Sequence, residues 1–230
     1  MKINSNIIMM TAWLAASSLF AASERQEKPE VGFIRIVHAV APGEGKLNIM
    51  VDGEDIFPKG YDLGQRTGGF GIKAGVHMIA LKKEGVESRP TQVTLKDDET
   101  LTLIGFAEKE PKKKEGDPPV WKTRILRLKQ SEPEHGFRMT LVSACDQDEV
   151  TVKTVVQGKK SIETASVKRL TTTLMDLGRS RREVLVKAGD EVITTISPED
   201  PGNYVVVLYQ GADGKIMALS FYDPKFVIAG

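Results

Sequence analysis

The sequence predicts an all-β protein built of two similar antiparallel β-sandwiches in tandem, and three observations lead to this prediction. Short runs rich in β-branched residues recur along the chain, separated by glycine, proline, asparagine or aspartate. No long stretch after Ser23 sustains the apolar period of a helix. The two halves also resemble each other at fixed offsets. Many short strands at even spacing are typical of immunoglobulin-like or jelly-roll-like sandwiches.

The overall composition is that of a globular protein with balanced charge. The 230 residues include 32 Lys+Arg and 31 Asp+Glu, for a formal net charge of +1. Proteins dedicated to nucleic-acid binding usually show a clear basic excess, so we expect no nucleic-acid partner. One cysteine and three histidines exclude an intrachain disulfide framework and a cysteine-rich zinc site. We therefore expect no metal and no other cofactor.

Residues 1–22 are typical of a secretory signal peptide. Lys2 is the only charge before Glu24, residues 7–20 are mostly apolar, and small residues follow at positions 21–23. The apolar run is short for a membrane span, although an uncleaved anchor is the alternative. We expect cleavage near Ala22, no stable span afterwards, and a periplasmic location.

The remaining chain divides into two sandwich domains over residues 31–130 and 137–228, joined by a linker at 130–136. Each apolar run between turn residues is expected to form one strand. In the first domain the expected strands are 33–39, 46–51, 70–72, 77–81, 92–95, 101–107 and 120–128. In the second they are 138–144, 150–156, 170–175, 183–186, 191–195, 204–209 and 215–222.

Internal matches indicate that the second domain is a copy of the first. At an offset of 105, five residues of the segment 34–53 recur: Val37, Ala39, Glu44, Val51 and Gly53 match Val142, Ala144, Glu149, Val156 and Gly158. At an offset of 114, residues 62–64 match 176–178, and 73–75 match 187–189. The difference predicts a nine-residue insertion between Gly158 and Asp176 in the second copy. Glycines at the turns are expected to supply positive φ angles.

The closing hairpins of the two copies are expected to differ. The second has a tight turn at residues 211–214, whereas the first has a long polar tip at 108–119 that contains Lys112, Lys113 and Lys114.

Few residues suit acid–base or nucleophilic chemistry. No Gly-x-Ser-x-Gly elbow occurs, and only the three histidines could act as a histidine base. His38 follows Ile34 and Ile36 at period two, so we expect it at the core edge, bonded to a loop carbonyl. His77 is expected to be exposed, and His135 lies in the linker.

The other candidate residues have structural interpretations. Cys145 follows an apolar run and is expected to be a small buried side chain; a reactive thiol or an intermolecular disulfide is the alternative. The acidic clusters at 97–99, 146–149 and 199–200 suit turns better than a calcium site. Trp121 is expected to pack rather than to bind sugar.

A basic stretch between Lys159 and Glu183 is the most distinctive charge pattern. Its seven bases outnumber its three acids by four. Such a patch suits an acidic partner or an anionic polysaccharide, and the alternative is an edge protected from strand pairing by its charge. The candidate binding residues are Lys159, Lys160, Lys168, Arg169, Arg179, Arg181 and Arg182.

Several short motifs carry a family resemblance. The opening run 33–39, Val51-Asp52-Gly53 and Lys73-Ala74-Gly75 before an alternating strand resemble a family of small secreted bacterial β-sandwich proteins of unknown function. The tandem arrangement, with Pro118-Pro119 opening the last hairpin strand of the first copy, is similar to the AlgF-like family of periplasmic accessory proteins in alginate O-acetylation. The resemblance implies two sandwich domains and a role beside acetyltransferases, and it brings no catalytic residues.

The sequence therefore predicts a non-enzymatic accessory protein of exopolysaccharide modification. Its expected partners are periplasmic proteins of a polysaccharide-acetylation machine, with an anionic polysaccharide as a further candidate. One alternative is an envelope polymer-binding module unrelated to acetylation. A second alternative is an enzyme such as an esterase.

Overall fold

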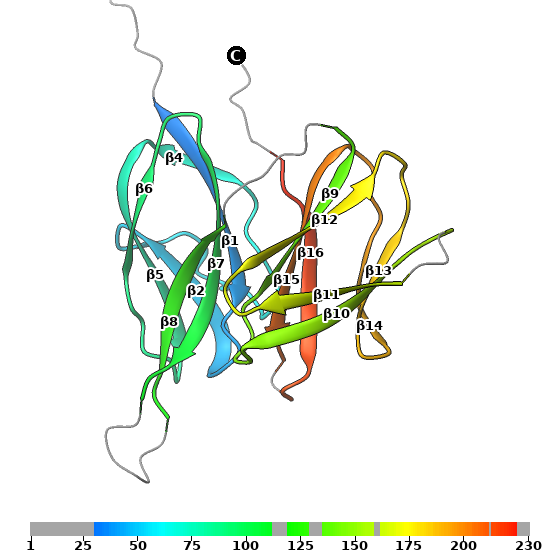
Figure 1. Ribbon diagram of the computed structural model, residues 1–230. Helices are drawn as coiled ribbons and strands as arrows, with labels where there is room; N and C mark the ends of the chain where they lie inside the picture. The colour runs from blue at the N-terminus through cyan, green and yellow to red at the C-terminus, as the bar shows by residue number, and fades with distance from the viewer. Residues whose placement is uncertain (1–29, 112–118, 129–134, 159–161, 212, 225–230) are drawn as a thin grey trace, which may run out of the picture.

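The computed structural model describes residues 30–111, 119–128, 135–158, 162–211 and 213–224. These residues form four sheets of four strands each and contain no helix, which confirms the all-β prediction (Figure 1). Within these ranges there is accordingly no apolar helix of the length that a membrane crossing requires. The expected signal peptide and the Lys112–Lys114 tip lie outside the described residues.

The first half of the chain folds into two facing sheets. One sheet has the order β4-β1-β7-β8, with β1 and β7 parallel, and the other has the order β3-β2-β5-β6. The strand bounds are β1 Val31–Ala39, β2 Glu44–Val51, β3 Glu54–Asp55, β4 Phe70–Lys73, β5 Gly75–Glu84, β6 Thr91–Leu95, β7 Thr100–Lys109 and β8 Trp121–Leu128.

The second half repeats this topology strand for strand. Its sheets have the orders β12-β9-β15-β16 and β11-β10-β13-β14, again with one parallel pair, β9 with β15. The strand bounds are β9 Phe137–Ser143, β10 Glu149–Val156, β11 Ile162–Lys168, β12 Thr172–Gly178, β13 Val184–Ala188, β14 Glu191–Ile196, β15 Gly202–Gln210 and β16 Ile216–Tyr222. The shared topology confirms the predicted duplication.

Strand pairing shows that the offset of 105 is correct and that the offset of 114 is wrong. Ile34 pairs with Phe70, and Met139 pairs with Met175, so β4 and β12 correspond at 105. The pairs of β2 with β5 and of β10 with β13 give the same offset. No nine-residue insertion separates the copies. The misleading matches come from different local structures: residues 62–64 lie at a turn, whereas 176–178 lie at the end of β12, so these identities do not mark corresponding positions.

The copies differ instead in how equal lengths of chain are used. The first places only Glu54–Asp55 beside β2 and then loops to β4, whereas the second extends the matching strand to Ile162–Lys168. Both β3 and β11 are absent from the strands expected from sequence. Polar residues dominate β11, and only Ala165 and Val167 in it are buried.

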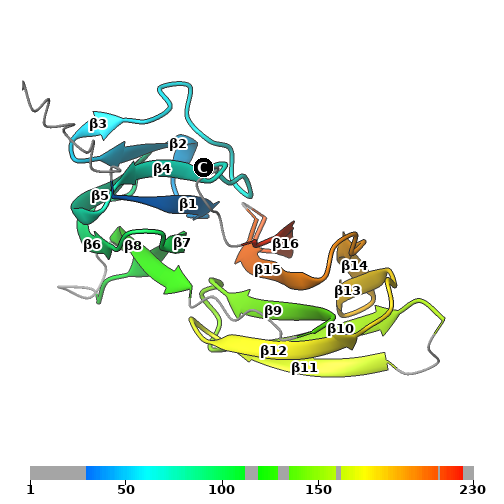
Figure 2. The same cartoon turned by 90° about the horizontal axis from the view of Figure 1, so that it is seen from above.

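The two sandwiches lie side by side (Figure 1; Figure 2), and a third core joins them. One core fills each sandwich, and a separate core joins the sheet of β1 and β7 to the sheet of β9 and β15. Val37, Ile104, Val142 and Val207 lie in this shared core and are fully buried. Strands β1, β7, β9 and β15 are therefore buried on both faces, which explains their continuous apolar runs.

Candidate interaction surfaces

A buried ion pair crosses the boundary between the two halves. The Arg35 guanidinium on β1 donates to the Asp223 carboxylate just after β16, and both side chains are almost completely shielded from solvent. The Thr102 hydroxyl donates to the same Asp223 oxygen at 2.9 Å. The guanidiniums of Arg35 and Arg66 lie 5.2 and 5.0 Å from the centroid of the Phe221 ring. Charges placed this way hold the two sheets in one register.

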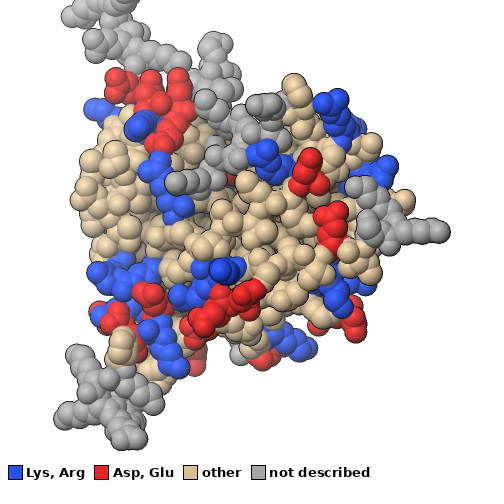
Figure 3. Space-filling model, in the orientation of Figure 1, with Lys and Arg blue, Asp and Glu red and all other residues tan. Residues whose placement is uncertain are grey.

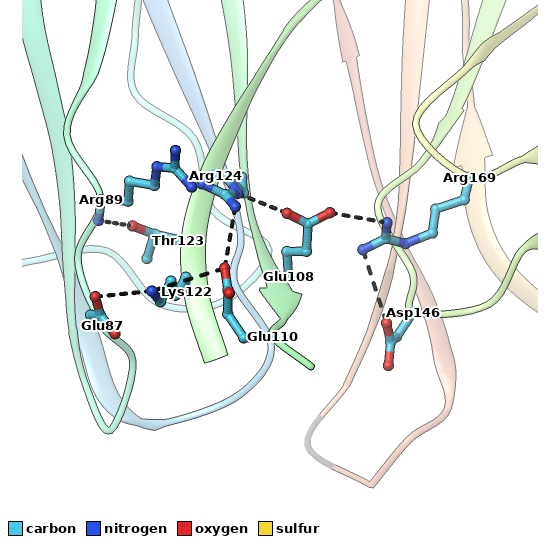
Figure 4. Close-up of polar contacts among 9 residues, drawn as sticks. All are labelled: Glu87, Arg89, Glu108, Glu110, Lys122, Thr123, Arg124, Asp146 and Arg169. Carbon is cyan, nitrogen blue, oxygen red and sulfur yellow. Dashed lines mark hydrogen bonds and ion pairs between the residues drawn. The ribbon is translucent and has the colours of Figure 1, made fainter. Parts of the chain in front are cut away.

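Arg169 forms a second connection at one end of the boundary (Figure 4). Its Nε donates to the Cys145 carbonyl at 2.9 Å, and its guanidinium lies 5.7 Å from the centroid of the Phe106 ring. Its terminal nitrogens lie 3.9 Å from carboxylate oxygens of Glu108 and Asp146. Because Glu108 lies on β7, this arginine of the second half is tied to the first.

The ionic contacts continue into the first half along β7 and β8. Arg124 Nε donates to the Glu108 carboxylate at 2.8 Å, and a terminal guanidinium nitrogen of Arg124 lies 3.4 Å from the Glu110 carboxylate. Lys122 lies 4.0 Å from Glu110 and 3.3 Å from Glu87. Acidic and basic side chains accordingly alternate across the lower part of the face in Figure 3, near where the halves meet. This surface is close to neutral and holds its charges in fixed pairs.

The predicted basic stretch does not form one patch. Lys168 ends β11 opposite Glu149, and Arg169 is engaged as described above. Arg179 follows the far end of β12, which at 3.3 Å per residue lies about 20 Å away. Lys159 and Lys160 lie outside the described residues.

Three arginines remain together in the loop between β12 and β13. Arg179 and Arg181 are exposed and Arg182 is half-buried. None of them forms an ion pair with another described residue. The neighbouring Glu183 accepts a hydrogen bond from Gln157 at 3.1 Å. This arginine loop, residues 179–182, is the part of the predicted patch that could bind an anionic group.

His38 is buried more deeply than expected and has a different partner. Its Nδ1 accepts a hydrogen bond from the Val40 backbone N–H at 3.1 Å, and it is Lys83 that donates to the Val40 carbonyl, at 2.8 Å. Burial, and then the charge of Lys83, lower the pKa of His38 to about 3. The imidazole is therefore neutral at physiological pH and has a structural role.

The expectation that His77 is exposed is wrong. Its side chain is only 13% exposed, and its Nδ1 lies 2.7 Å from the Asp52 carboxylate. Its Nε2 lies 2.8 Å from the Lys73 carbonyl oxygen. Both neighbours are acceptors, so this position favours a ring that carries protons on both nitrogens. Burial opposes this charge, but the bonds to Asp52 and Lys73 outweigh it and raise the pKa of His77.

Cys145 is buried and Trp121 packs against a core, as the sequence predicts. Cys145 is fully buried, and this burial raises the pKa of its thiol. Trp121 packs against the first core, with Lys109 Nζ 5.8 Å from the ring centroid. His135 is exposed beside Gly136.

The acidic cluster at 97–99 has the expected turn role. Asp97 accepts a hydrogen bond from the Val31 backbone N–H, and Glu99 accepts one from the Lys96 backbone N–H. Within the described part of the chain, no three histidine, cysteine or acidic side chains come close enough to hold a metal ion.

A small cavity lies at the end of the second sandwich where β14 approaches β16. Its volume is about 270 Å³, and its walls include Thr195, Ser197, Tyr204 and Tyr222. Sequence reasoning did not identify this site, because residues on β14, β15 and β16 meet only after the sheets pack. No known protein-family model and no curated protein matches the sequence.

Proposed function

We propose that this chain is a rigid, non-enzymatic adaptor that works outside the cytoplasm in the O-acetylation of an exported polysaccharide. The observation that supports an adaptor is the stacking of the two sandwiches through a shared core, fixed by the Arg35–Asp223 pair and by Arg169. The proposed process, O-acetylation of a polysaccharide, rests on the sequence resemblance to AlgF-like proteins.

Stacking gives an adaptor a physical advantage. Loops at the ends of both sandwiches are held at constant separation, so two partners could bind without the entropic cost of ordering a flexible linker. The neutral, paired charges along β7 and β8 add to this rigidity, since each Arg124 or Lys122 contact is shared between neighbouring strands. The arginine loop at 179–182 lies at the end of the second sandwich where β12 ends.

The groups best suited to catalysis are held in structural roles, which favours a non-enzymatic function. The His38 ring is neutral and buried, and His77 uses both nitrogens to bridge Asp52 and Lys73. The Cys145 thiol is buried, and its raised pKa keeps it protonated.

Deleting the gene in its source organism tests the proposal. We expect the exported polysaccharide to lose acetyl esters, measured by NMR of the purified polymer, while its amount stays the same. Affinity capture of the tagged chain from the cell envelope should co-purify the acetyltransferases. Unchanged acetyl content in the deletion strain would contradict the proposal. Labelling of the pure protein by a serine-reactive probe would instead favour an enzyme.

A polymer-binding module is the second candidate, and the arginine loop is the observation that favours it. Three cationic side chains within residues 179–182, without ion-pair partners among the described residues, suit an anionic polysaccharide. In that case binding to purified polymer would persist even though acetyl content does not depend on the gene.

A further inference from the structure

The cavity between β14 and β16 has the dimensions of a site for one side chain. Its volume of about 270 Å³ is below the range typical of sites for drug-sized ligands. It is partly open to solvent and is lined by Thr195, Ser197, Glu199, Asp200, Tyr204 and Tyr222, together with neighbouring residues.

The wall of the cavity is built before any ligand binds. The Tyr204 hydroxyl accepts hydrogen bonds from the backbone N–H groups of Glu199 and Asp200 at 3.0 and 3.2 Å and donates to the Asp200 carbonyl at 2.8 Å. The Tyr222 hydroxyl donates to the Pro201 carbonyl at 3.2 Å. The two tyrosine rings contact each other, with centroids 5.2 Å apart. The loop at 197–201 is therefore held in one conformation around two aromatic rings.

The electrostatics of the cavity favour a cation. Glu199 and Asp200 are exposed, and neither forms an ion pair with any residue that the structure describes. No lysine or arginine is among the lining residues. The faces of aromatic rings carry negative partial charge and attract cations. The carboxylates of Glu199 and Asp200 and the half-buried ring of Tyr222 thus favour a cation, while Tyr204 is almost fully buried and fixes the loop from the core side.

We propose that this cavity binds a positively charged side chain of a partner protein. Arginine is the best fit, since its planar guanidinium can stack on tyrosine while donating to two carboxylates. The inference rests on the proposed adaptor function and names the chemistry of one partner, a basic segment. The arginine loop and this cavity would then bind groups of opposite charge at the same end of the second sandwich.

A titration followed by amide NMR tests the proposal. The probe is N-acetyl-arginine amide, and its neutral isostere, N-acetyl-citrulline amide, is the matched ligand. We expect the arginine probe to shift the amide signals of residues 197–201 and Tyr222, and the citrulline probe to bind about tenfold more weakly. Equal binding of both probes, or shifts confined to other regions, would overturn the proposal.

Two charge-neutralising variants locate the effect. Glu199→Gln combined with Asp200→Asn should lower the affinity for the arginine probe by about tenfold. Asp148→Asn combined with Glu149→Gln changes the net charge equally at the opposite end of the same sandwich, and it should leave binding unchanged. If both double variants bind the arginine probe more weakly, the effect is one of overall charge, and this result would contradict the proposed site. The amide spectrum of each variant reports whether the fold is intact.

Two further arms complete the experiment. Glucose should not shift the signals at 197–201; saturable shifts there would assign the cavity to sugars and overturn the proposal. A chain that ends at Pro224 lacks residues 225–230 and should bind the probe at least as well; loss of binding would assign the probe's site to those residues and overturn the cavity. If the probe fails to bind while deletion of the gene removes acetyl esters, the cavity proposal is wrong and the adaptor proposal stands.

Discussion

Arg35 and Asp223 carry opposite charges in a place that is shielded from solvent on all sides. Moving either charge out of water is costly, and the cost is offset by the partner charge, by Thr102 and by the Phe221 ring. The second oxygen of Asp223 has no hydrogen-bond partner among the described residues. Replacing only one of the two residues should therefore destabilise the fold, because the other charge stays buried without its partner.

We predict that Arg35→Ala lowers the free energy of unfolding by about 3–5 kcal/mol, because it leaves a buried carboxylate without a counter-charge. Urea denaturation measures this change. Replacing both members, by Arg35→Met with Asp223→Leu, should recover most of the loss, since no isolated charge then remains. Lys215→Ala, which removes an exposed contact to Asp213, is the control and should cost less than about 0.5 kcal/mol. A similar loss of unfolding free energy for Arg35→Ala and for Lys215→Ala would contradict the prediction.

His77 couples stability to pH. Its pKa is raised in the folded state, so its contribution is complete below its unfolded value near 6.5 and is lost as pH rises through the folded value. The pKa of Asp52 is lowered, first by the bond from His77 and then by the Met78 backbone N–H. The contribution of Asp52 is therefore lost at acidic pH, as pH falls through its folded pKa.

We predict that the stability difference between wild type and His77→Ala is largest between these two pKa values and shrinks as pH rises above that of His77. The difference should be about 1 kcal/mol or less, because the contact to Asp52 is partly exposed. Urea denaturation at a series of pH values measures it. A difference that grows with rising pH would show that the ring is neutral.

Among the elements, the β2–β3 hairpin illustrates how a local motif specifies a turn. Asp52 and Gly53 have φ angles of 51° and 92°. A two-residue hairpin with positive φ at both positions is the type I′ turn that Asp-Gly favours. The same turn orients Asp52 to bind His77 and the Met78 backbone on β5. A sequence motif thus positions a side chain that then joins β2 to β5.

The arginine loop between β12 and β13 is the element with the clearest test. If it binds a polyanion, the affinity should fall steeply with added salt, because the contact is electrostatic. Arg179→Glu, Arg181→Glu and Arg182→Glu together should abolish the binding of alginate measured by calorimetry at low salt. The fold should be largely unaffected, since none of the three has an ion-pair partner among the described residues and such loop charges contribute little to stability.

Lys168→Glu, at the other end of β12, provides the control for this triple variant. It should leave alginate binding nearly unchanged if the loop is the site. Binding that does not depend on salt, or that survives the triple reversal, would leave the arginines as edge protection.

At the scale of the whole molecule, the two sandwiches are joined by a shared core. Each would expose a broad apolar face if separated, because Ile104 and Phe106 of the first half and Val205 and Val207 of the second all belong to the shared core. Exposed apolar surface of this kind promotes association of isolated domains.

We therefore predict a single calorimetric unfolding transition for the intact chain. Val207→Asp should place an unpaired charge in the shared core and lower the unfolding free energy by about 3 kcal/mol or more. Asp148→Asn, on the surface, should have little effect. Two resolved transitions in the wild-type protein would show that the halves fold independently.

The chain by itself determined most of the strands, the duplication and the burial of Cys145. Period-two patterns, turn residues and the offset of 105 are local or repeated signals, and they can be read without knowing which strands pair. Strand β11 was not predicted, because it lies at a sheet edge with one exposed face and therefore contains few apolar residues.

Only the tertiary structure decided the rest. It rejected the offset of 114, separated Lys168 from Arg179, and engaged Arg169 with Glu108. It also placed His77 beside Asp52 and assembled the cavity around Tyr204. Each of these depends on residues far apart in sequence, and their proximity is set by which sheets pack face to face. Which side chains form contacts, and which charged side chains have an ion-pair partner, is therefore set only by that packing.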